Sequence, residues 1–364
     1  MSPLVAIVSF RLGAADGVSV VAGHWAAAFG RLGLAVRTVA GAGVADRLLP
    51  GLVIGAAGGP EPDELARALD GADLVVVANV CSLPLNPAAA GALAAQLAGR
   101  PAILHHHDLP WQRLRFAGVE GWPPDDPAWV HVTINELSRK ELADRGTAAT
   151  TVYSGFADPP PGRRELARGV LGVPPGRRLL LQPTRAIARK NVPAGIAVAA
   201  AVDADYWLTG PAEEGYGPEL ERLLATAGVP VHRRVPAGLT MEDAYAASDA
   251  VVFPSTWEGF GAPVIEASLH RRALAVGDYP VAAELAGFGL RWFPVDDPGP
   301  LRAFLADPDQ ALLDHNRAVA LRHFSLDTLA RQLADLLRAA GWGALLEEAA
   351  PPGSGRRRPG PEGA

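Results

Sequence analysis

The sequence predicts an α/β protein built from two doubly wound domains, in which helices cover both faces of mainly parallel sheets. Short, nearly uninterrupted apolar runs alternate with Ala/Leu-rich segments of helical spacing. Continuous apolar runs are typical of parallel strands that are buried on both faces. The alternation stops once, at the Pro/Gly-rich stretch 157–163, and then starts again. A chain of 364 residues is long enough for two such domains.

The first domain is predicted over residues 1–160. Its expected strands are 4–10, 35–40, 73–80, 102–107 and 129–135. Helices are expected between them at 19–32, 62–70 and 88–98. This strand–helix–strand order predicts a doubly wound, Rossmann-like sheet.

The second domain is predicted over residues 161–345 and repeats the same order. Its expected strands are 178–183, 205–210, 230–235, 249–255 and 273–278, with helices at 191–202, 217–227, 241–247, 263–270 and 280–286. A long helical segment at 310–340 is expected to complete it. The Pro/Gly/Arg-rich tail 350–364 is predicted to be disordered.

Composition excludes several classes of protein. Hydrophobic residues make up 49% of the chain, which argues against global disorder. The net charge of −6 does not favour nucleic acid or an anionic bilayer as the main partner. The single cysteine, Cys81, lies in an apolar stretch and cannot form an internal disulfide. Without a signal-peptide pattern or an apolar run of roughly 18 residues, we expect a soluble, cytoplasmic protein without stable membrane insertion.

The stretch PSTWEGFGAPVIEA, residues 254–267, follows a predicted strand, and doubly wound sheets bind ligands beyond the carboxyl ends of their strands. Gly259 and Gly261 permit a tight turn and the close approach of a ligand. Pro263 suits a helix start, whose free N–H groups attract anions. A solvated loop acid and an acid favoured by the helix dipole would explain Glu258 and Glu266 singly, but their combination with this turn favours a binding site.

A second candidate is PTRAIARKN, residues 183–191, which follows the first strand of the second domain. Arg185 and Lys190 are spaced so that both could reach one diphosphate. The chain has only two lysines, Lys140 and Lys190, so a lysine here indicates that a compact point charge matters. A solvated surface turn is the alternative. Arg189 competes with either cation for this role, and we expect it to face solvent.

Three consecutive histidines, residues 105–107, end another predicted strand. Successive strand residues point to opposite faces, so the three side chains cannot converge on one metal ion. No other set of Cys and His residues has ligand spacing, and no metal site is predicted. One histidine at the strand end is the better candidate for contact with a ligand, and His106 and His107 are the alternatives.

The pattern of Glu258 and Glu266, separated by seven residues in EGFGAPVIEA, strongly resembles the signature of family-4 retaining glycosyltransferases. The resemblance covers nearly the whole chain in its domain order and is most specific from 178 to 286. It implies the GT-B fold, in which two Rossmann-like domains face each other across a cleft. Residues 1–160 would then form the acceptor side and residues 161–345 the nucleotide-sugar donor side.

The resemblance also implies roles for individual residues. Glu258 would contact hydroxyls of the donor sugar, and Glu266 would bind the ribose hydroxyls of the nucleotide. Arg185 and Lys190 would stabilise the leaving diphosphate. His107, which the resemblance favours over its competitor His106, would contact the donor sugar and help to stabilise the transition state. The remaining implied substrate contacts are Gly259, Phe260, Gly261 and Ala262 at the sugar, Val264 at the diphosphate, Val235 at the base, and Asp16 and Gly17 in the phosphate-side loop. The family often has a Gly-Gly pair where this chain has Asp16 and Gly17, which is a departure from its pattern.

The reaction implied by the resemblance is retaining, metal-independent transfer of a sugar from a nucleoside-diphosphate sugar, with a UDP-sugar expected, to a hydroxyl of a small-molecule or glycan acceptor. No cofactor is expected, since the nucleotide sugar is a co-substrate. A nucleotide-sugar epimerase of the same architecture and a non-catalytic nucleotide-sugar binder are the alternatives. Asp203-Ala204-Asp205 has the form of a metal-binding Asp-x-Asp, but it precedes its strand, and a solvated turn is expected there.

Overall fold

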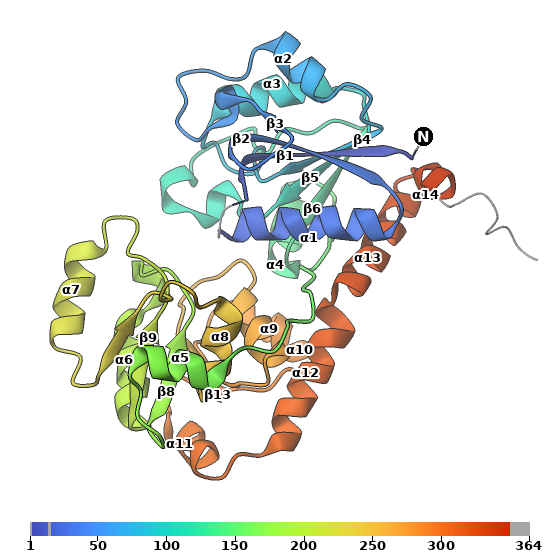
Figure 1. Ribbon diagram of the computed structural model, residues 1–364. Coiled ribbons are helices and arrows are strands. Elements are labelled where there is room, and N and C mark those ends of the chain that lie inside the picture. The colour runs from blue at the N-terminus through green and yellow to red at the C-terminus, as the bar shows by residue number, and fades with distance from the viewer. Residues whose placement is uncertain (1, 14–15, 350–364) are drawn as a thin grey trace, which may run out of the picture. The chain divides into compact units, whose positions relative to one another are not determined.

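The computed structural model describes residues 2–13 and 16–349 and divides into two compact units (Figure 1). The first unit comprises Met1–Gly155 and Leu326–Ala364, and the second comprises Phe156–Ser325. The chain therefore passes between the units close to the predicted boundary at 160. The predicted disordered tail, 350–364, lies outside the described residues.

The first unit is built on a parallel sheet of seven strands in the order β3-β2-β1-β4-β5-β6-β7. Its strands are β1 (Leu4–Leu12), β2 (Ala35–Gly43), β3 (Arg47–Leu48), β4 (Leu74–Ala78), β5 (Ala102–His106), β6 (Trp129–Thr133) and β7 (Ala149–Thr151). Its α-helices are α1 (Gly17–Arg31), α2 (Pro62–Ala68), α3 (Pro87–Leu97), α4 (Glu136–Ala143), α13 (Leu326–Ala339) and α14 (Ala344–Ala349).

The core of the first unit lies on both faces of this sheet, as the continuous apolar strands predict. Alternate residues of a strand point to opposite faces. Val5 and Ile7 of β1 accordingly join the cluster under α1 and α13, whereas Ala6 and Val8 join the one under α2 and α3.

The helical segment predicted at 310–340 is two helices that belong to different units. The α12 helix (Gln310–Phe324) ends at Ser325, whose backbone is extended. The next helix, α13, packs on α1 of the first unit with its apolar stripe, which includes Leu329, Leu333 and Leu337 (Figure 1). The expectation that this whole segment completes the second domain is therefore corrected, because the α13 stripe is part of the first core.

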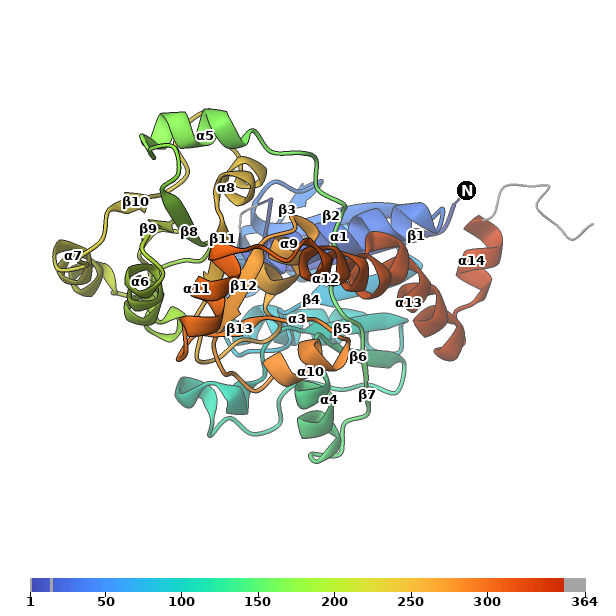
Figure 2. The same cartoon turned by 90° about the horizontal axis from the view of Figure 1, so that it is seen from below.

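The second unit has a parallel sheet of six strands in the order β10-β9-β8-β11-β12-β13. Its strands are β8 (Arg178–Gln182), β9 (Ala204–Leu208), β10 (Val231–Arg233), β11 (Ala250–Phe253), β12 (Ala273–Val276) and β13 (Phe293–Pro294). Its remaining helices are α5 (Arg164–Leu171), α6 (Val192–Ala201), α7 (Gly217–Ala225), α8 (Met241–Ala247), α9 (Ala262–Leu269), α10 (Ala282–Gly287) and α11 (Gly299–Ala306). In Figure 2 as in Figure 1, α5 lies beside α8.

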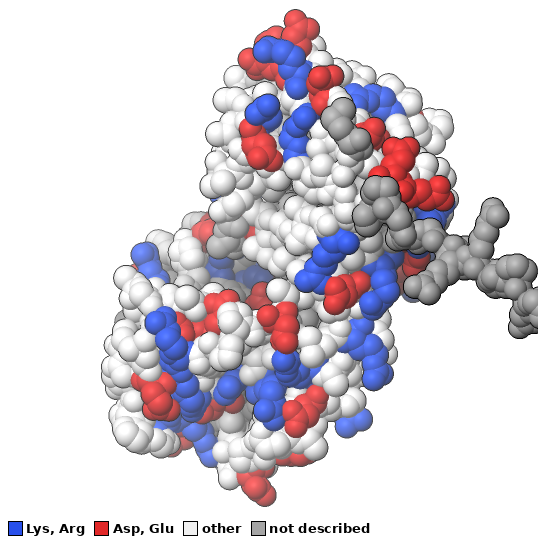
Figure 3. Space-filling model, turned by 45° about the vertical axis from the view of Figure 1, so that its right-hand side comes forward, with Lys and Arg blue, Asp and Glu red and all other residues white. Residues whose placement is uncertain are grey.

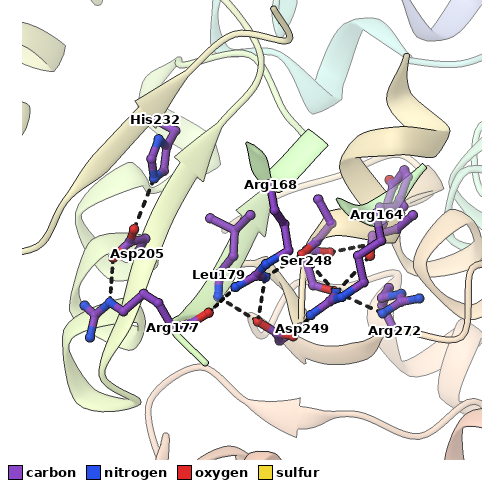
Figure 4. A network of polar contacts seen from close by, with 12 residues as sticks. Arg164, Arg168, Arg177, Leu179, Asp205, His232, Ser248, Asp249 and Arg272 are labelled. Carbon is purple, nitrogen blue, oxygen red and sulfur yellow. Dashed lines mark hydrogen bonds and ion pairs between the residues drawn. The ribbon is translucent and has the colours of Figure 1, made fainter. Parts of the chain in front are cut away.

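An ionic network ties the amino ends of β8 and β11 to the end of α8 (Figure 4). Asp249 accepts hydrogen bonds from Arg164 Nη2 at 2.6 Å and from the Leu179 N–H at 2.8 Å. Arg164 and Arg272 also donate to the Ser248 carbonyl, both at 3.1 Å, where cations suit the negative end of the α8 dipole. These charged groups lie at the amino ends of the strands, and other residues lie at the carboxyl ends.

Asp205 belongs to a second part of the same network (Figure 4). Its side chain is buried and accepts from Arg177 Nε at 2.7 Å, and His232 Nε2 lies 3.2 Å away. The Asp-x-Asp string was expected in a solvated turn, which holds for the exposed Asp203 but not for Asp205. Burial of Asp205 in an ion pair explains its presence without a metal.

Charge on the surface is mixed. On the face drawn in Figure 3, basic and acidic side chains are interspersed.

None of the helices in residues 2–13 and 16–349 is both long enough and apolar enough to cross a membrane.

Candidate functional site

The main candidate site lies at the carboxyl ends of β8 and β11, which are neighbours in the second sheet. The chain winds away from β8 in one direction through β9 and β10, and in the other through β11 to β13. Doubly wound sheets bind ligands at such a switch point, because the two loops leave it on opposite faces. The loops are 183–191 after β8 and 254–261 after β11. The Thr256 N–H joins them by donating to the Arg189 carbonyl at 2.9 Å.

Lys190 is a buried cation at the end of the first loop. Its carbonyl accepts from the Gln182 Nε2 amide at 2.9 Å, and its Nζ lies 2.5 Å from Glu258 Oε1. Burial lowers the pKa of Lys190 to about 8, although the Glu258 carboxylate opposes that shift. The loop thus holds a lysine whose charge is costly to bury and is retained by a single carboxylate.

Glu258 is the centre of this charge cluster. Its other oxygen, Oε2, accepts from Arg189 Nη1 at 2.9 Å. Burial acts to raise the pKa of Glu258, but the charges of Lys190 and Arg189 outweigh it and hold that pKa below its usual value. Arg189 was expected to face solvent, and this is corrected: it is mostly covered because Glu258 and the Trp257 carbonyl bind its guanidinium.

Arg185 lies near Lys190, and its charge contributes to the lowered pKa of that lysine. Its Nη1 donates to Glu213 Oε2 at 2.6 Å, and both side chains are about two-fifths exposed (39% and 43%). The structure therefore gathers three cations, Arg185, Arg189 and Lys190, at one strand end with two carboxylates.

The glycine turn before α9 has the geometry that the sequence predicts. Gly261 caps the helix with φ 108°, a backbone conformation that side chains disfavour. A Cβ atom there would lie 2.2 Å from the Tyr279 Oη. Phe260 is buried against Phe156, with ring centroids 6.2 Å apart. Because this side chain faces the core, the backbone of the turn is the part that can face a ligand.

The helix begins at Ala262, one residue before the proline expected to open it. Pro263 is the second helical residue, and Val264 is fully buried. The Val264 N–H donates to the Gly261 carbonyl at 2.9 Å and so closes the turn. Gly259 lies in the turn itself and is partly exposed.

Glu266 lies one turn further along α9 and away from the cation cluster. Tyr245 of α8 donates its hydroxyl to Glu266 Oε2 at 2.5 Å. Tyr245 is itself buried and stacks on His270, with ring centroids 4.6 Å apart. Burial raises the pKa of Glu266, whereas the tyrosine hydroxyl acts against that rise. One carboxylate oxygen is thus fixed by a rigid neighbour.

Val235 lies in the loop between β10 and α8 and is partly exposed. The residue before it, Arg234, has a positive φ of 59°. Its carbonyl accepts from Trp207 Nε1 at 2.7 Å, which anchors the loop to β9. The backbone at Val235 is therefore held in place, as a contact through main-chain groups requires.

In the first unit, the contacts distinguish the two histidine candidates. His106 Nδ1 lies 2.7 Å from Ser82 Oγ and its Nε2 lies 2.8 Å from His131 Nδ1, so both ring nitrogens are engaged. His107 follows the end of β5, and its Nε2 is buried with no hydrogen-bond partner among the described residues. Burial lowers the pKa of His107 to about 4, which keeps its imidazole neutral. These contacts favour His107.

The loop after β1 carries the other candidates of the first unit. Asp16 caps α1, accepting from the Ser19 N–H at 3.1 Å. Gly17 opens the helix, and a Cβ atom there would meet nothing within 4 Å. The fold itself therefore does not require a glycine at this position.

Two residues that were not predicted as site residues, Gln182 and Asn79, form hydrogen bonds with the backbone of candidate residues. Gln182 is a buried polar residue that follows three leucines at the end of the strand RLLLQ, and this position was a visible signal. Asn79 has a positive φ of 64°, and its Oδ1 accepts from the His107 N–H at 3.0 Å. Such a backbone conformation leaves no mark in a single sequence.

Comparisons with known proteins agree with this geometry. Residues 187–304, which include the α9 turn and Lys190, match the family described as Glycosyl transferases group 1. Mannosylglucosylglycerate synthase of Thermotoga maritima is 27% identical over 327 residues, covering 73% of this chain and 76% of that protein. The enzyme of the same name from Petrotoga mobilis is 25% identical over 260 residues, covering 57% of this chain and 60% of that protein.

Solved structures share the fold. The structure of Anabaena HepE in complex with UDP-glucose superposes with a TM-score of 0.72 at 17% identity, covering 92% of this chain and 99% of that one. Sucrose-phosphate synthase from Thermosynechococcus elongatus gives a TM-score of 0.68 at 16% identity, covering 93% and 98%.

These findings support the transferase prediction over the epimerase and the non-catalytic binder. The family match covers Arg189, Lys190, Glu258 and the glycine turn, and the fold similarity extends over both units. The chain is a glycosyltransferase of the GT-B fold, and its residues 187–304 match the family described as Glycosyl transferases group 1.

Proposed function

We propose that the chain transfers a sugar from a nucleoside-diphosphate sugar, a UDP-sugar first, to a hydroxyl acceptor with retention of the anomeric configuration and without a metal ion. The observation that carries this proposal is the cluster of Arg185, Arg189 and Lys190 beside the start of α9. Three cations and a helix start at one strand end suit a diphosphate. The UDP-glucose complex of HepE supports the choice of donor.

The proposed chemistry is heterolysis of the bond between the anomeric carbon and the diphosphate oxygen. Negative charge grows on the diphosphate as this bond breaks, and Arg185 and Lys190 stabilise it. A preorganised charge contact of this kind lowers the activation free energy by about 3–4 kcal/mol. In a retaining reaction the acceptor hydroxyl attacks from the leaving group's side. Its proton passes to the departing diphosphate, so the reaction needs no separate base.

The other candidates bind rather than react. Glu258 orients the sugar, and Glu266 binds the ribose hydroxyls with the oxygen that Tyr245 leaves open. Val235 contacts the base through its backbone, and the turn from Gly259 to Ala262, with Val264, holds the sugar and the diphosphate. On the first unit, Asp16, Gly17 and His107 are the proposed substrate contacts, with His107 directed at the donor sugar.

The acceptor is proposed to be a small hydroxylated molecule. Two relatives are named as synthases of mannosylglucosylglycerate, a small glycoside, although they share only about a quarter of their residues with this chain. The mannosyl group in their name makes a nucleotide sugar that carries mannose the second donor to test.

The test begins with the donor. Binding of UDP-, GDP-, ADP- and TDP-sugars is measured by calorimetry, and the donors that bind are incubated with sugars and glycerate glycosides as acceptors. We expect a UDP-sugar to bind and give a product whose anomeric proton coupling, measured by NMR, matches that of the donor. An inverted product refutes retention, and loss of activity on chelation with EDTA refutes the metal-free mechanism. A new nucleotide sugar formed without acceptor indicates an epimerase instead.

A further inference from the structure

Glu213 lies opposite Arg185 because two loops run side by side. One loop follows β8, and the other, residues 209–216, follows the neighbouring strand β9. The Ala186 N–H donates to the Pro211 carbonyl at 2.8 Å, and the Glu213 N–H donates to the Ala186 carbonyl at 3.1 Å. A third bond, from the Gly210 N–H to the Thr184 carbonyl, is 3.1 Å long. The pairing of the strands thus continues into the loops.

The contact between the loops is close. A Cβ atom on Gly210 would lie 2.3 Å from the Thr184 carbonyl oxygen and 2.5 Å from the Arg185 nitrogen. Neither atom can move without disturbing the backbone. The position of Glu213 relative to Arg185 is therefore set by main-chain geometry, unlike that of two side chains that meet by chance on a surface.

The ion pair engages only part of the hydrogen-bonding capacity of the Arg185 guanidinium. Glu213 Oε2 binds Nη1 at 2.6 Å, and a guanidinium carries five N–H donors in a fixed planar fork. Among the described residues, this is the one hydrogen-bond partner recorded for the Arg185 side chain. Anchoring one arm of the fork restricts where the guanidinium can lie, and the remaining N–H donors stay available to a ligand.

The two carboxylates of the site pair with different numbers of cations. Glu258 forms ion pairs with both Lys190 and Arg189, whereas Glu213 forms one with Arg185. An exposed pair of this kind contributes only about 0–1 kcal/mol to stability. Removing Glu213 should accordingly leave the fold intact and change mainly the orientation of Arg185.

We propose that Glu213 is a positioning residue, which holds the Arg185 guanidinium in the orientation that binds the diphosphate of the donor. This inference rests on the proposed function, in which Arg185 contacts that diphosphate. Glu213 itself does not touch the substrate in this arrangement and acts only through Arg185.

The test is a double-mutant cycle on nucleotide binding, which needs no acceptor. Calorimetry measures the affinities of UDP and UMP for the wild type, Glu213→Gln, Arg185→Ala and the double variant. We expect Glu213→Gln to weaken UDP binding about three- to fivefold, the size of an exposed charge contact. UMP lacks the second phosphate and should bind with unchanged affinity. In the Arg185→Ala background, Glu213→Gln should have no further effect.

Glu214→Gln is the matched control, since it removes the same charge from the next residue of the loop, which is also exposed. It should leave UDP binding unchanged. The inference is overturned if Glu213→Gln strengthens UDP binding, because Glu213 would then compete with the diphosphate. An effect that persists without Arg185 overturns it too. If Arg185→Ala alone binds UDP like the wild type, it is the proposed role of Arg185 that fails.

Discussion

Burial disfavours the positive charge of Lys190, and the neighbouring carboxylate of Glu258 stabilises it. Burial lowers its pKa to about 8, and the carboxylate of Glu258 limits that shift. A lysine of this kind is still protonated near neutral pH, where the proposed mechanism needs its positive charge beside the leaving group.

A pH profile tests this role. We expect kcat/KM, which reports ionisations of the free enzyme, to be level below about pH 8 and to fall up to tenfold per pH unit above it, as Lys190 loses its proton. Lys190→Arg should remove this fall up to about pH 10, because a guanidinium stays protonated over that range. The kcat/KM value for the donor is measured from pH 6 to 10 for both enzymes. If both profiles turn at the same pH, another group is responsible.

Charge deletion tests the cluster directly. We expect Arg185→Ala and Lys190→Ala each to lower turnover at least about a hundredfold, since each removes a contact made to developing charge. Circular dichroism checks that the variants are folded. Lys140→Ala changes the other lysine of the chain, which lies in α4, and should keep wild-type turnover. A loss of only about a tenth in folded Arg185→Ala or Lys190→Ala would remove that residue from the mechanism.

At the scale of elements, two helices have a glycine at their start, Gly17 for α1 and Gly261 for α9, and the reason for the glycine differs between them. Gly261 has a positive φ, and a Cβ atom there would collide with Tyr279. Among the described residues, nothing lies within 4 Å of a Cβ atom placed on Gly17. The fold therefore needs a glycine at position 261, whereas the described residues give no packing reason for one at position 17, which fits the proposed contact of that loop with the substrate.

Alanine substitutions should separate these causes. We expect Gly261→Ala to lower the free energy of unfolding by at least about 2 kcal/mol, from backbone strain and the clash. Gly17→Ala should keep the wild-type melting temperature and lower transfer activity. Thermal unfolding and donor turnover are measured on both. A fully active Gly17→Ala enzyme would contradict contact between the substrate and this loop.

The long strands were predictable because buried parallel strands are continuous apolar runs. The edge strands β3, β7 and β13 were not predicted, since each has only two or three residues and depends on a neighbour for its pairing. The glycine turn, Lys190 and the paired glutamates were also visible, because special backbone geometry and rare residues mark a sequence. Partners such as Glu213 and Tyr245 come from other loops and helices, and only the fold brings them near.

At the scale of the whole molecule, buried histidines predict sensitivity to acid. His105, His106, His107 and His131 lie together in the first unit, and burial lowers the pKa of each. Below pH 6.5 the unfolded chain binds protons on these histidines that the folded chain does not bind, and for His107 this holds down to about pH 4. The free energy of unfolding therefore falls as the pH falls, by about 1.4 kcal/mol per pH unit for each histidine that responds fully.

Urea denaturation at pH 7.5, 6.5 and 5.0 measures this effect. We expect little change between the first two values and a clear loss at pH 5.0, with lower protection factors against hydrogen exchange for the amides of β5 and β6. Stability that is equal at pH 7.5 and 5.0 would show that the histidines titrate in the folded state.

The α13 helix has a consequence for how the chain is made. Its leucines complete the core under α1, yet they are far along the chain from the strands that they cover. The second unit is continuous from Phe156 to Ser325, so its segments are all synthesised before this helix emerges. During translation the apolar face of the first unit under α1 therefore stays uncovered until after the second unit has been made.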